Sequence, residues 1–257
     1  MNSTENYPLP AGMGDIIGTI AHMGVGIAGI LWGLRCILKN DAFEHGTKAE
    51  KVTYLVSAFW EVVGTIPLMT IPELCYHSLA CYQRNVTHVL AGSCMFLGVI
   101  WDILLRRLRV PSRNNWGIAV ISSISPAYFL YFHDHDKVEM GEDSELIVHQ
   151  NAMLMFALMG ILRFLIPLLP SVAVTLRSVY AFTSMSLGSL MFLAGPGIRE
   201  TLVSVGFSGT NISFGAFFAA SCFFLVGMII RENAPLRQGY ENLPVEMVHL
   251  PGSVGLV

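Results

Sequence analysis

The stretch GDIIGTIAHMGVGIAGILWGLRCIL, from Gly14 to Leu38, decides the fold class of this chain. Apart from single charges near its ends and one histidine, it is apolar, and it exceeds the roughly 20 residues that an α-helix needs to cross a bilayer. A stripe of small residues runs along it: Gly14, Gly18, His22, Gly26, Gly29 and Gly33. Such a stripe lets two helices approach closely in lipid, so we expect a packed membrane helix with His22 facing protein.

The composition supports the same class. Hydrophobic residues make up 53% of the 257 residues and charged residues only 13%. Soluble proteins carry about 25% charged residues, so the composition excludes a soluble globular protein. The net charge of −3 is small and no basic patch with interleaved aromatic residues is present, which excludes a nucleic-acid-binding protein. The first apolar run is too long for a signal-peptide core, so we expect an uncleaved anchor.

The apolar runs predict an all-α, polytopic membrane protein built as a seven-helix transmembrane bundle. The spans are expected at about residues 14–38, 52–71, 86–105, 116–132, 146–169, 172–193 and 212–230. They form one transmembrane domain, residues 13–231, between an outer N-terminal tail, residues 1–12, and a flexible cytosolic tail, residues 232–257. Pro126 is expected to kink the fourth span. Residues 194–211 are expected to form a glycine-rich loop.

The distribution of positive charge predicts an outer N-terminus and a cytosolic C-terminus. With seven spans, one side carries ten lysines and arginines: Arg35, Lys39, Lys48, Lys51, Arg106, Arg107, Arg109, Arg113, Arg231 and Arg237. The opposite side carries three: Arg84, Lys137 and Arg199. The richer side is expected in the cytosol, and Arg177, near the start of the sixth span, is expected to reach the membrane surface. Glycosylation sequons at Asn2, Asn85 and Asn211 fall on the outer side, which predicts a glycoprotein.

Charged residues inside the expected spans are costly in lipid and need partners. Glu61 lies near the middle of the second span, where we expect its partner to be a histidine or a bound cation. Asp102 follows His88 by 14 residues in the third span. Arg163 follows His149 by the same 14 residues in the fifth. The two charges then lie at similar depth, which predicts an Asp102–Arg163 ion pair; the alternative is that each side chain reaches the nearer membrane surface separately.

Histidines gather around the acidic stretch YFHDHDKVEMGEDSELIVHQ, from Tyr131 to Gln150. The expected topology brings five histidines from four spans to the outer side of the bundle, with one carboxylate somewhat deeper. The candidate metal ligands are His22, Glu61, His88, His133, His135 and His149. Imidazole suits zinc, copper and iron, and carboxylates can complete such a site. The cluster therefore predicts a site for zinc or another divalent transition metal, and a hydrogen-bonded structural network is the alternative.

Two cysteines, Cys75 and Cys81, lie in an expected outer loop, six residues apart. That spacing allows a disulfide or a metal role and decides neither. The remaining cysteines, Cys36, Cys94 and Cys222, lie in or beside apolar runs, where cysteine most often serves in packing.

The expected cytosolic tail contains GYENL, from Gly239 to Leu243. A tyrosine followed by a bulky apolar residue three positions later resembles the extended motif that clathrin adaptors bind, here Tyr240 to Leu243. This motif predicts an integral membrane protein of the secretory and endosomal pathway, in the Golgi, plasma membrane or endo-lysosome.

Several of these motifs together resemble the transmembrane protein 45 family, also called domain of unknown function 716. They are AHMGVGIAGILWGL in the first span, a glutamate in the second, HVLAGSCMFLGVIWD in the third, and FHDH followed by VHQ. The likeness covers roughly residues 14–165 and implies a seven-span membrane protein without an established biochemical activity. It implies that the family's polar positions are His22, Glu61, His88, Asp102, His133, His135 and His149.

The chain departs from that family pattern at three places. The loop between His135 and His149 is longer, Pro126 stands where the family has a glutamate, and the last span lacks a histidine near Cys222. If that missing histidine is a ligand in relatives, the site in this chain is altered or incomplete.

Three classes of function follow from the sequence. The first is a membrane protein that binds a transition metal for sensing, transport or storage. The second is an enzyme, with His88 and His149 as axial haem ligands, or with Glu61 as the general base of a zinc hydrolase. The third is a receptor-like or scaffold protein whose histidines form a structural network. We expect the first, a protein that is not an enzyme.

Overall fold

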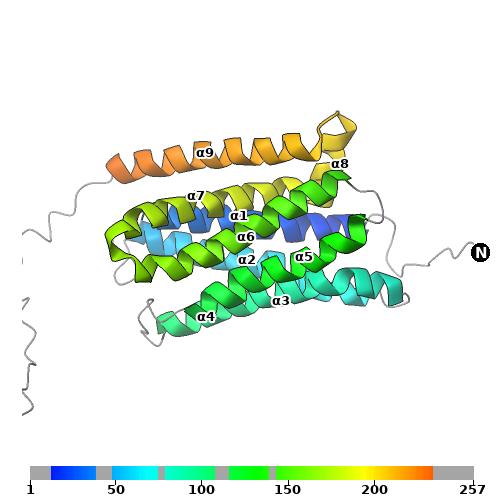
Figure 1. Ribbon diagram of the computed structural model, residues 1–257, viewed down its shortest axis with the longest axis horizontal. Helices are drawn as coiled ribbons and strands as arrows, with labels where there is room; N and C mark the ends of the chain where they lie inside the picture. Colours follow the sequence, from blue (N-terminus) through cyan, green and yellow to red (C-terminus); the bar gives the residue numbers. More distant parts are fainter. Residues whose placement is uncertain (1–12, 39–47, 75–78, 108–115, 139–142, 234–257) are drawn as a thin grey trace, which may run out of the picture.

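The computed structural model describes residues 13–38, 48–74, 79–107, 116–138 and 143–233. All elements in these ranges are helical, and none of the described residues belongs to a β-strand. The long helices lie side by side along one direction (Figure 1). The all-α prediction is therefore confirmed. The two expected tails lie outside the described residues, apart from the last residues of the final helix.

The helices overlap all seven predicted spans and extend several of them. In chain order the segments are α1 Met13–Leu38, α2 Lys48–Leu74, α3 Leu79–Arg107, α4 Trp116–Ala119, η2 Val120–Ile124, α5 Ser125–Val138, α6 Asp143–Leu168, η3 Pro170–Val172, α7 Ala173–Ala194, α8 Pro196–Ser204 and α9 Gly209–Asn233. The fourth predicted span corresponds to α4, η2 and α5 in direct succession.

The irregularity expected at Pro126 takes the form of a π-helical segment, η2, that comes directly before it. The backbone N–H of Ser125 donates to the carbonyl of Val120, five residues back. In a regular α-helix the ring of Pro126 would clash with the carbonyl of Ser122, four residues back. The wider π turn relieves that clash, and π segments of this kind are frequent at functional sites.

Residues 194–211 were predicted to be a loop, and this prediction is wrong because they contain α8. Gly195, with φ −54° and ψ 132°, leaves the helical region and ends α7. Pro196 then starts α8, in the first helical turn, where its missing N–H costs no hydrogen bond. The chain bends by 74° between the two helices. The N–H of Gly197 donates to the hydroxyl of Thr19 at 2.9 Å, which holds α8 against α1.

The helices have the length and apolarity expected of an integral membrane protein. By these two criteria four described helices can cross a membrane: Ile16–Leu38, Val52–Met69, Ile147–Leu168 and Gly209–Glu232. The bent pair of Pro170–Ala194 and Pro196–Ser204 makes a fifth if it counts as one span, while Val89–Leu105 and Gly117–Tyr131 are apolar but shorter. Large apolar side chains such as Leu55, Leu154 and Phe218 are exposed on the bundle, as expected of a surface that faces lipid.

Six of the long segments form a closed ring. The neighbouring pairs are α1–α2, α2–α3, α3–α5, α5–α6, α6–α7 and α7–α1. Helix α9 packs outside this ring, on α7 with contacts to α1 and α6, and it lies at one edge of the bundle (Figure 1). The ring therefore has an interior of its own, to which α1 to α7 contribute and which α9 only flanks.

Glycines bring α1 into close contact with its two neighbours in the ring. A Cβ on Gly26 would lie 2.7 Å from the backbone oxygen of Gly188 on α7. On the other side of α1, a Cβ on Gly24 would lie 2.6 Å from the Cα of Gly64 on α2. No side chain fits at either crossing. The small-residue stripe predicted for the first span is thus a helix-packing surface, and it packs against α7.

The ring interior is mainly apolar. The largest buried apolar cluster includes Ala21, Met95, Leu130, Phe156 and Leu190, one residue from each of α1, α3, α5, α6 and α7, and it extends to α9. Because lipid is as apolar as these side chains, close packing rather than exclusion from water holds them together. Polar groups inside the ring therefore stand out against an apolar background.

Candidate functional site

A cavity of about 130 Å³ lies inside the ring, toward one end of the bundle. Its walls come from the later halves of α1, α3 and α6, the middle of α2, the segments α4 and η2, and the first part of α7. The lining side chains with polar or charged groups are Trp32, Arg35, Cys36, Glu61, Asp102, Ser122, Ser123, Arg163, Arg177, Tyr180 and Ser184. No lining residue belongs to α9. The chain therefore concentrates ionisable groups from α1, α2, α3, α6 and α7 in one small space.

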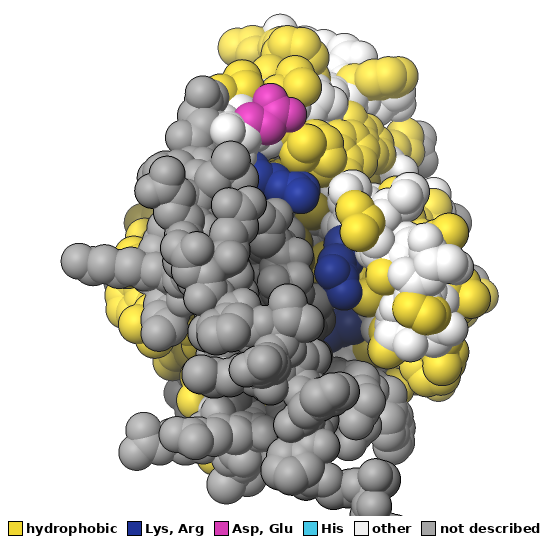
Figure 2. All heavy atoms as spheres, turned by 90° about the vertical axis from the view of Figure 1, so that its left-hand side faces the viewer, with side chains coloured by type: hydrophobic (Ala, Val, Ile, Leu, Met, Phe, Trp, Pro, Cys, Tyr) yellow, Lys and Arg dark blue, Asp and Glu magenta, His cyan; other side chains and the backbone are white. Residues whose placement is uncertain are grey.

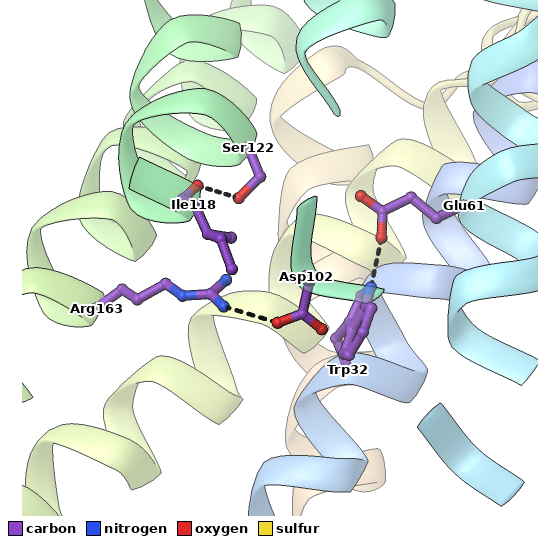
Figure 3. A network of polar contacts seen from close by, with 6 residues as sticks. All are labelled: Trp32, Glu61, Asp102, Ile118, Ser122 and Arg163. Atoms are coloured by element: carbon purple, nitrogen blue, oxygen red, sulfur yellow. Dashed lines mark hydrogen bonds and ion pairs between the residues drawn. The ribbon is translucent and has the colours of Figure 1, made fainter. Parts of the chain in front are cut away.

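An ion pair crosses the cavity between α3 and α6. The Arg163 Nη2 atom lies 3.8 Å from the Asp102 Oδ1 atom, and the two side chains point toward each other (Figure 3). Their exposed fractions are 25% for Arg163 and 13% for Asp102, so the protein encloses each side chain only in part. The predicted Asp102–Arg163 pair is confirmed.

Glu61 on α2 has a different partner from the one expected. Its Oε2 atom accepts a hydrogen bond of 2.6 Å from the indole Nε1–H of Trp32 on α1 (Figure 3). We had expected a histidine or a cation in this role. Glu61 shares the cavity with Asp102 and Arg163, so the structure groups this carboxylate with the ion pair.

Arg35 is buried against two aromatic rings, although the sequence suggested a residue at the cytosolic surface. Its guanidinium carbon lies 5.1 Å from the ring centre of Trp32 and 4.8 Å from that of Tyr54, and only 6% of the residue is exposed. The two rings meet edge to face at 5.4 Å. Such contacts stabilise a cation that is removed from water. The three-residue spacing of Trp32 and Arg35 on one helix face was the signal that could have revealed this contact.

Arg177 on α7 also lines the cavity instead of reaching the membrane surface on its own. Its Nε atom is buried and has no hydrogen-bond partner among the described residues. Among the described lining residues, three arginines thus face the two carboxylates Glu61 and Asp102. The described lining therefore carries one formal positive charge in excess.

Arginine or lysine side chains are visible at this end of the bundle, next to apolar side chains (Figure 2). The π segment η2 forms another part of the wall: the hydroxyl of Ser122 donates to the carbonyl of Ile118 at 2.6 Å, and Ser123 is buried. A π segment next to an intramembrane ion pair adds a second feature that is common at functional sites.

The predicted histidine ligands belong to the opposite end of the bundle. His22 is buried and its Nδ1 atom lies 2.8 Å from the carbonyl oxygen of Gly18, one turn earlier on α1. His149 near the start of α6 is also buried. The side chains of His88, His133 and His135 lie outside the described part of the structure. Among the described side chains no group of three or more His, Cys, Asp or Glu could hold a metal ion.

The structure describes only some of the predicted cysteines, glycosylation sequons and tail motifs. Cys36 lines the cavity, whereas Cys222 on α9 is exposed rather than packed. Cys75 and the side chain of Cys81 lie outside the description, as do Asn2 and the adaptor motif in the tail. Asn85 falls within α3, and Asn211 lies exposed in the first turn of α9. The glycoprotein and disulfide predictions therefore stay predictions.

Comparison with family models, curated proteins and solved structures finds no match for this chain. The resemblance to the transmembrane protein 45 family stays a prediction.

Proposed function

We propose that this chain is a seven-span membrane protein that binds a small molecule in the cavity inside its ring of helices. The proposed orientation puts the N-terminus outside and the C-terminus in the cytosol, because the richer set of lysines and arginines lies on the C-terminal side. The cavity then lies in the cytosolic half of the membrane, since α1, α3 and α6 end there.

One observation carries this proposal: an apolar cavity within a membrane bundle holds five charged side chains from five different helices, Arg35, Glu61, Asp102, Arg163 and Arg177. Charges within a bundle are costly, and where they occur they mark binding sites or pathways for ions and substrates. A mostly apolar pocket with a few convergent polar groups is also the usual form of a small-molecule site.

The binding proposal can be tested on purified protein by thermal unfolding with a panel of small solutes of each charge class. A true ligand at about 100 times its Kd stabilises the folded state by ~2.7 kcal/mol, which corresponds to a shift of roughly 5–10 °C for a protein of this size. Ala28 is buried and lines the cavity, so Ala28→Leu fills space that the ligand needs and should abolish the shift.

Ala219→Leu is the matched control, because Ala219 is half-buried on α9, away from the cavity. This variant should respond to the same solutes as the wild type. If no solute class stabilises the wild type, or if Ala28→Leu responds as strongly as Ala219→Leu, the cavity is not a ligand site.

The end of the bundle opposite the cavity supports a second proposal, a site for zinc or another divalent transition metal. The start of α1, α3 and α6 and the end of α5 lie at one end of the bundle (Figure 1), and these segments carry the predicted histidine ligands. Elemental analysis of purified wild type should find about one metal ion per chain. The combined His→Ala variant at His88, His133, His135 and His149 should lose that metal; equal metal content in both proteins would reject the proposal.

A further inference from the structure

We infer that the ligand of the cavity is a small organic anion with an apolar body, and that Arg177 binds its anionic group. This inference rests on the proposed function and names the class of ligand that the same cavity takes. Four observations carry it: the charge of the lining, the contacts of Arg177, the apolar wall and the size of the space.

The positive charges of the cavity outnumber the negative ones. Asp102 faces Arg163 at 3.8 Å, and Glu61 accepts the Trp32 N–H at 2.6 Å. The described lining includes three arginines and only these two carboxylates. Because an uncompensated charge within a membrane bundle is costly, a ligand with one negative charge restores the balance.

Arg177 is the arginine best placed to receive that charge. Its Nε atom is buried without a hydrogen-bond partner among the described residues. A buried donor without an acceptor is costly, and in native structures it calls for an unseen partner. Guanidinium groups bind planar carboxylates through two parallel hydrogen bonds, and the Nε–H is one of the donors that can take part.

The rest of the wall requires an apolar body of limited size. Val25, Met95, Val99, Phe156 and Met159 also line the cavity. The volume of about 130 Å³ is close to that of an engineered cavity of about 150 Å³ that binds benzene in another protein. The space therefore fits a short aliphatic or a single-ring carboxylate, and it is too small for a nucleotide.

Cys36 provides a native reporter, because it lines the same cavity. In a protein that retains Cys36 as its only cysteine, two thiosulfonate reagents of similar size and opposite charge can be compared. The thiolate attacks the thiosulfonate sulfur, a mixed disulfide forms and methanesulfinate leaves. The ratio of the anionic to the cationic labelling rate is measured on Cys36 and on a small thiol in solution. This ratio should be roughly tenfold higher on Cys36, as expected for one net positive charge at close range.

Matched variants connect this preference to Arg177. Arg177→Gln should remove most of it, whereas Arg177→Lys, which keeps the charge, should retain it. Arg199→Gln changes an arginine of α8 that does not line the cavity, so it should leave the ratio unchanged. Arg177→Lys also distinguishes loss of the charge from damage to the site. If both Arg177 variants lose the preference and Arg199→Gln keeps it, the site is damaged and the role of this charge is overturned.

A matched ligand series separates the possible outcomes. Hexanoate should slow the labelling of Cys36 by a small neutral thiosulfonate several-fold, whereas hexanamide and hexylammonium should not. Labelling without any preference for anions, or protection by hexylammonium, overturns the inference but leaves the proposed binding function standing. If Cys36 reacts with none of the reagents, both the anion inference and the proposed binding function fail. Protection by an anionic phospholipid but not by hexanoate would assign the site to a lipid headgroup and overturn the free carboxylate.

Discussion

The Asp102–Arg163 pair allows a quantitative test of how this bundle tolerates charge. The two closest atoms are 3.8 Å apart, a separation at which opposite unit charges attract each other by ~4 kcal/mol at an effective dielectric constant of about 20. Removing one partner of a buried pair typically costs ~3–5 kcal/mol, because the remaining charge stays without compensation. Both side chains are partly exposed, at 25% and 13%, so we expect the lower end of that range, ~3 kcal/mol.

The perturbation is a double-mutant cycle with Asp102→Asn, Arg163→Leu and the combined variant. Asn keeps the shape of Asp102 and removes its charge. Each single variant should lower the free energy of unfolding by ~3 kcal/mol, while the combined variant should lose only ~1–2 kcal/mol, since no charge remains uncompensated.

The assay is reversible unfolding in mixed detergent micelles, with helix content and tryptophan fluorescence as probes. Arg199→Leu, Glu200→Gln and their combination form the control cycle, because these α8 residues lie outside the cavity and should show coupling below ~1 kcal/mol. The reasoning would be refuted if the losses of Asp102→Asn and Arg163→Leu were additive, which would mean that each charge is solvated on its own.

Three further changes test separate parts of the structure. Gly188→Ala should destabilise the protein by ~1–3 kcal/mol, because its Cβ would lie 2.5 Å from backbone atoms of α1. The control Gly215→Ala has its nearest contact at 3.9 Å and should be neutral or slightly stabilising. Equal effects of the two substitutions would contradict the close crossing of α1 and α7. Trp32→Phe keeps an aromatic ring but removes the N–H that Glu61 accepts at 2.6 Å, so thermal unfolding should show a loss of ~1–3 kcal/mol, and an unchanged melting temperature would argue against that bond. Tyr240→Ala should raise the surface level of the protein in labelled cells if the tail motif binds an adaptor, and equal surface levels and internalisation rates would remove that prediction.

The histidines predicted to bind a metal and the charged cavity lie at opposite ends of the bundle. The sequence made His133, His135 and their neighbours conspicuous because they are close together in the chain. The cavity residues are single charges scattered over five helices, with no local motif that connects Arg35 to Arg177. Glu61 was recognised as a costly charge, but its partner Trp32 lies 29 residues away on another helix. Nothing in the spacing of those two residues could have revealed the contact.

The sequence alone determined those features that depend only on the geometry of a single helix. Length and apolarity specified membrane helices, the glycine spacing on α1 specified a close-packed face, and two equal offsets of 14 residues matched the depths of Asp102 and Arg163. These inferences need only the rise and pitch of a helix. The tertiary structure decided which faces point into the ring, that α7 closes the ring against α1 while α9 stays outside, and that Arg35 and Arg177 turn inward. In a membrane protein both the lipid-facing and the inner side of a helix are apolar, so the pattern that reveals the buried face of a soluble helix is largely lost. The packing of backbones at the glycine crossings fixes how α1, α2 and α7 are rotated against one another, and with it where their charged side chains lie.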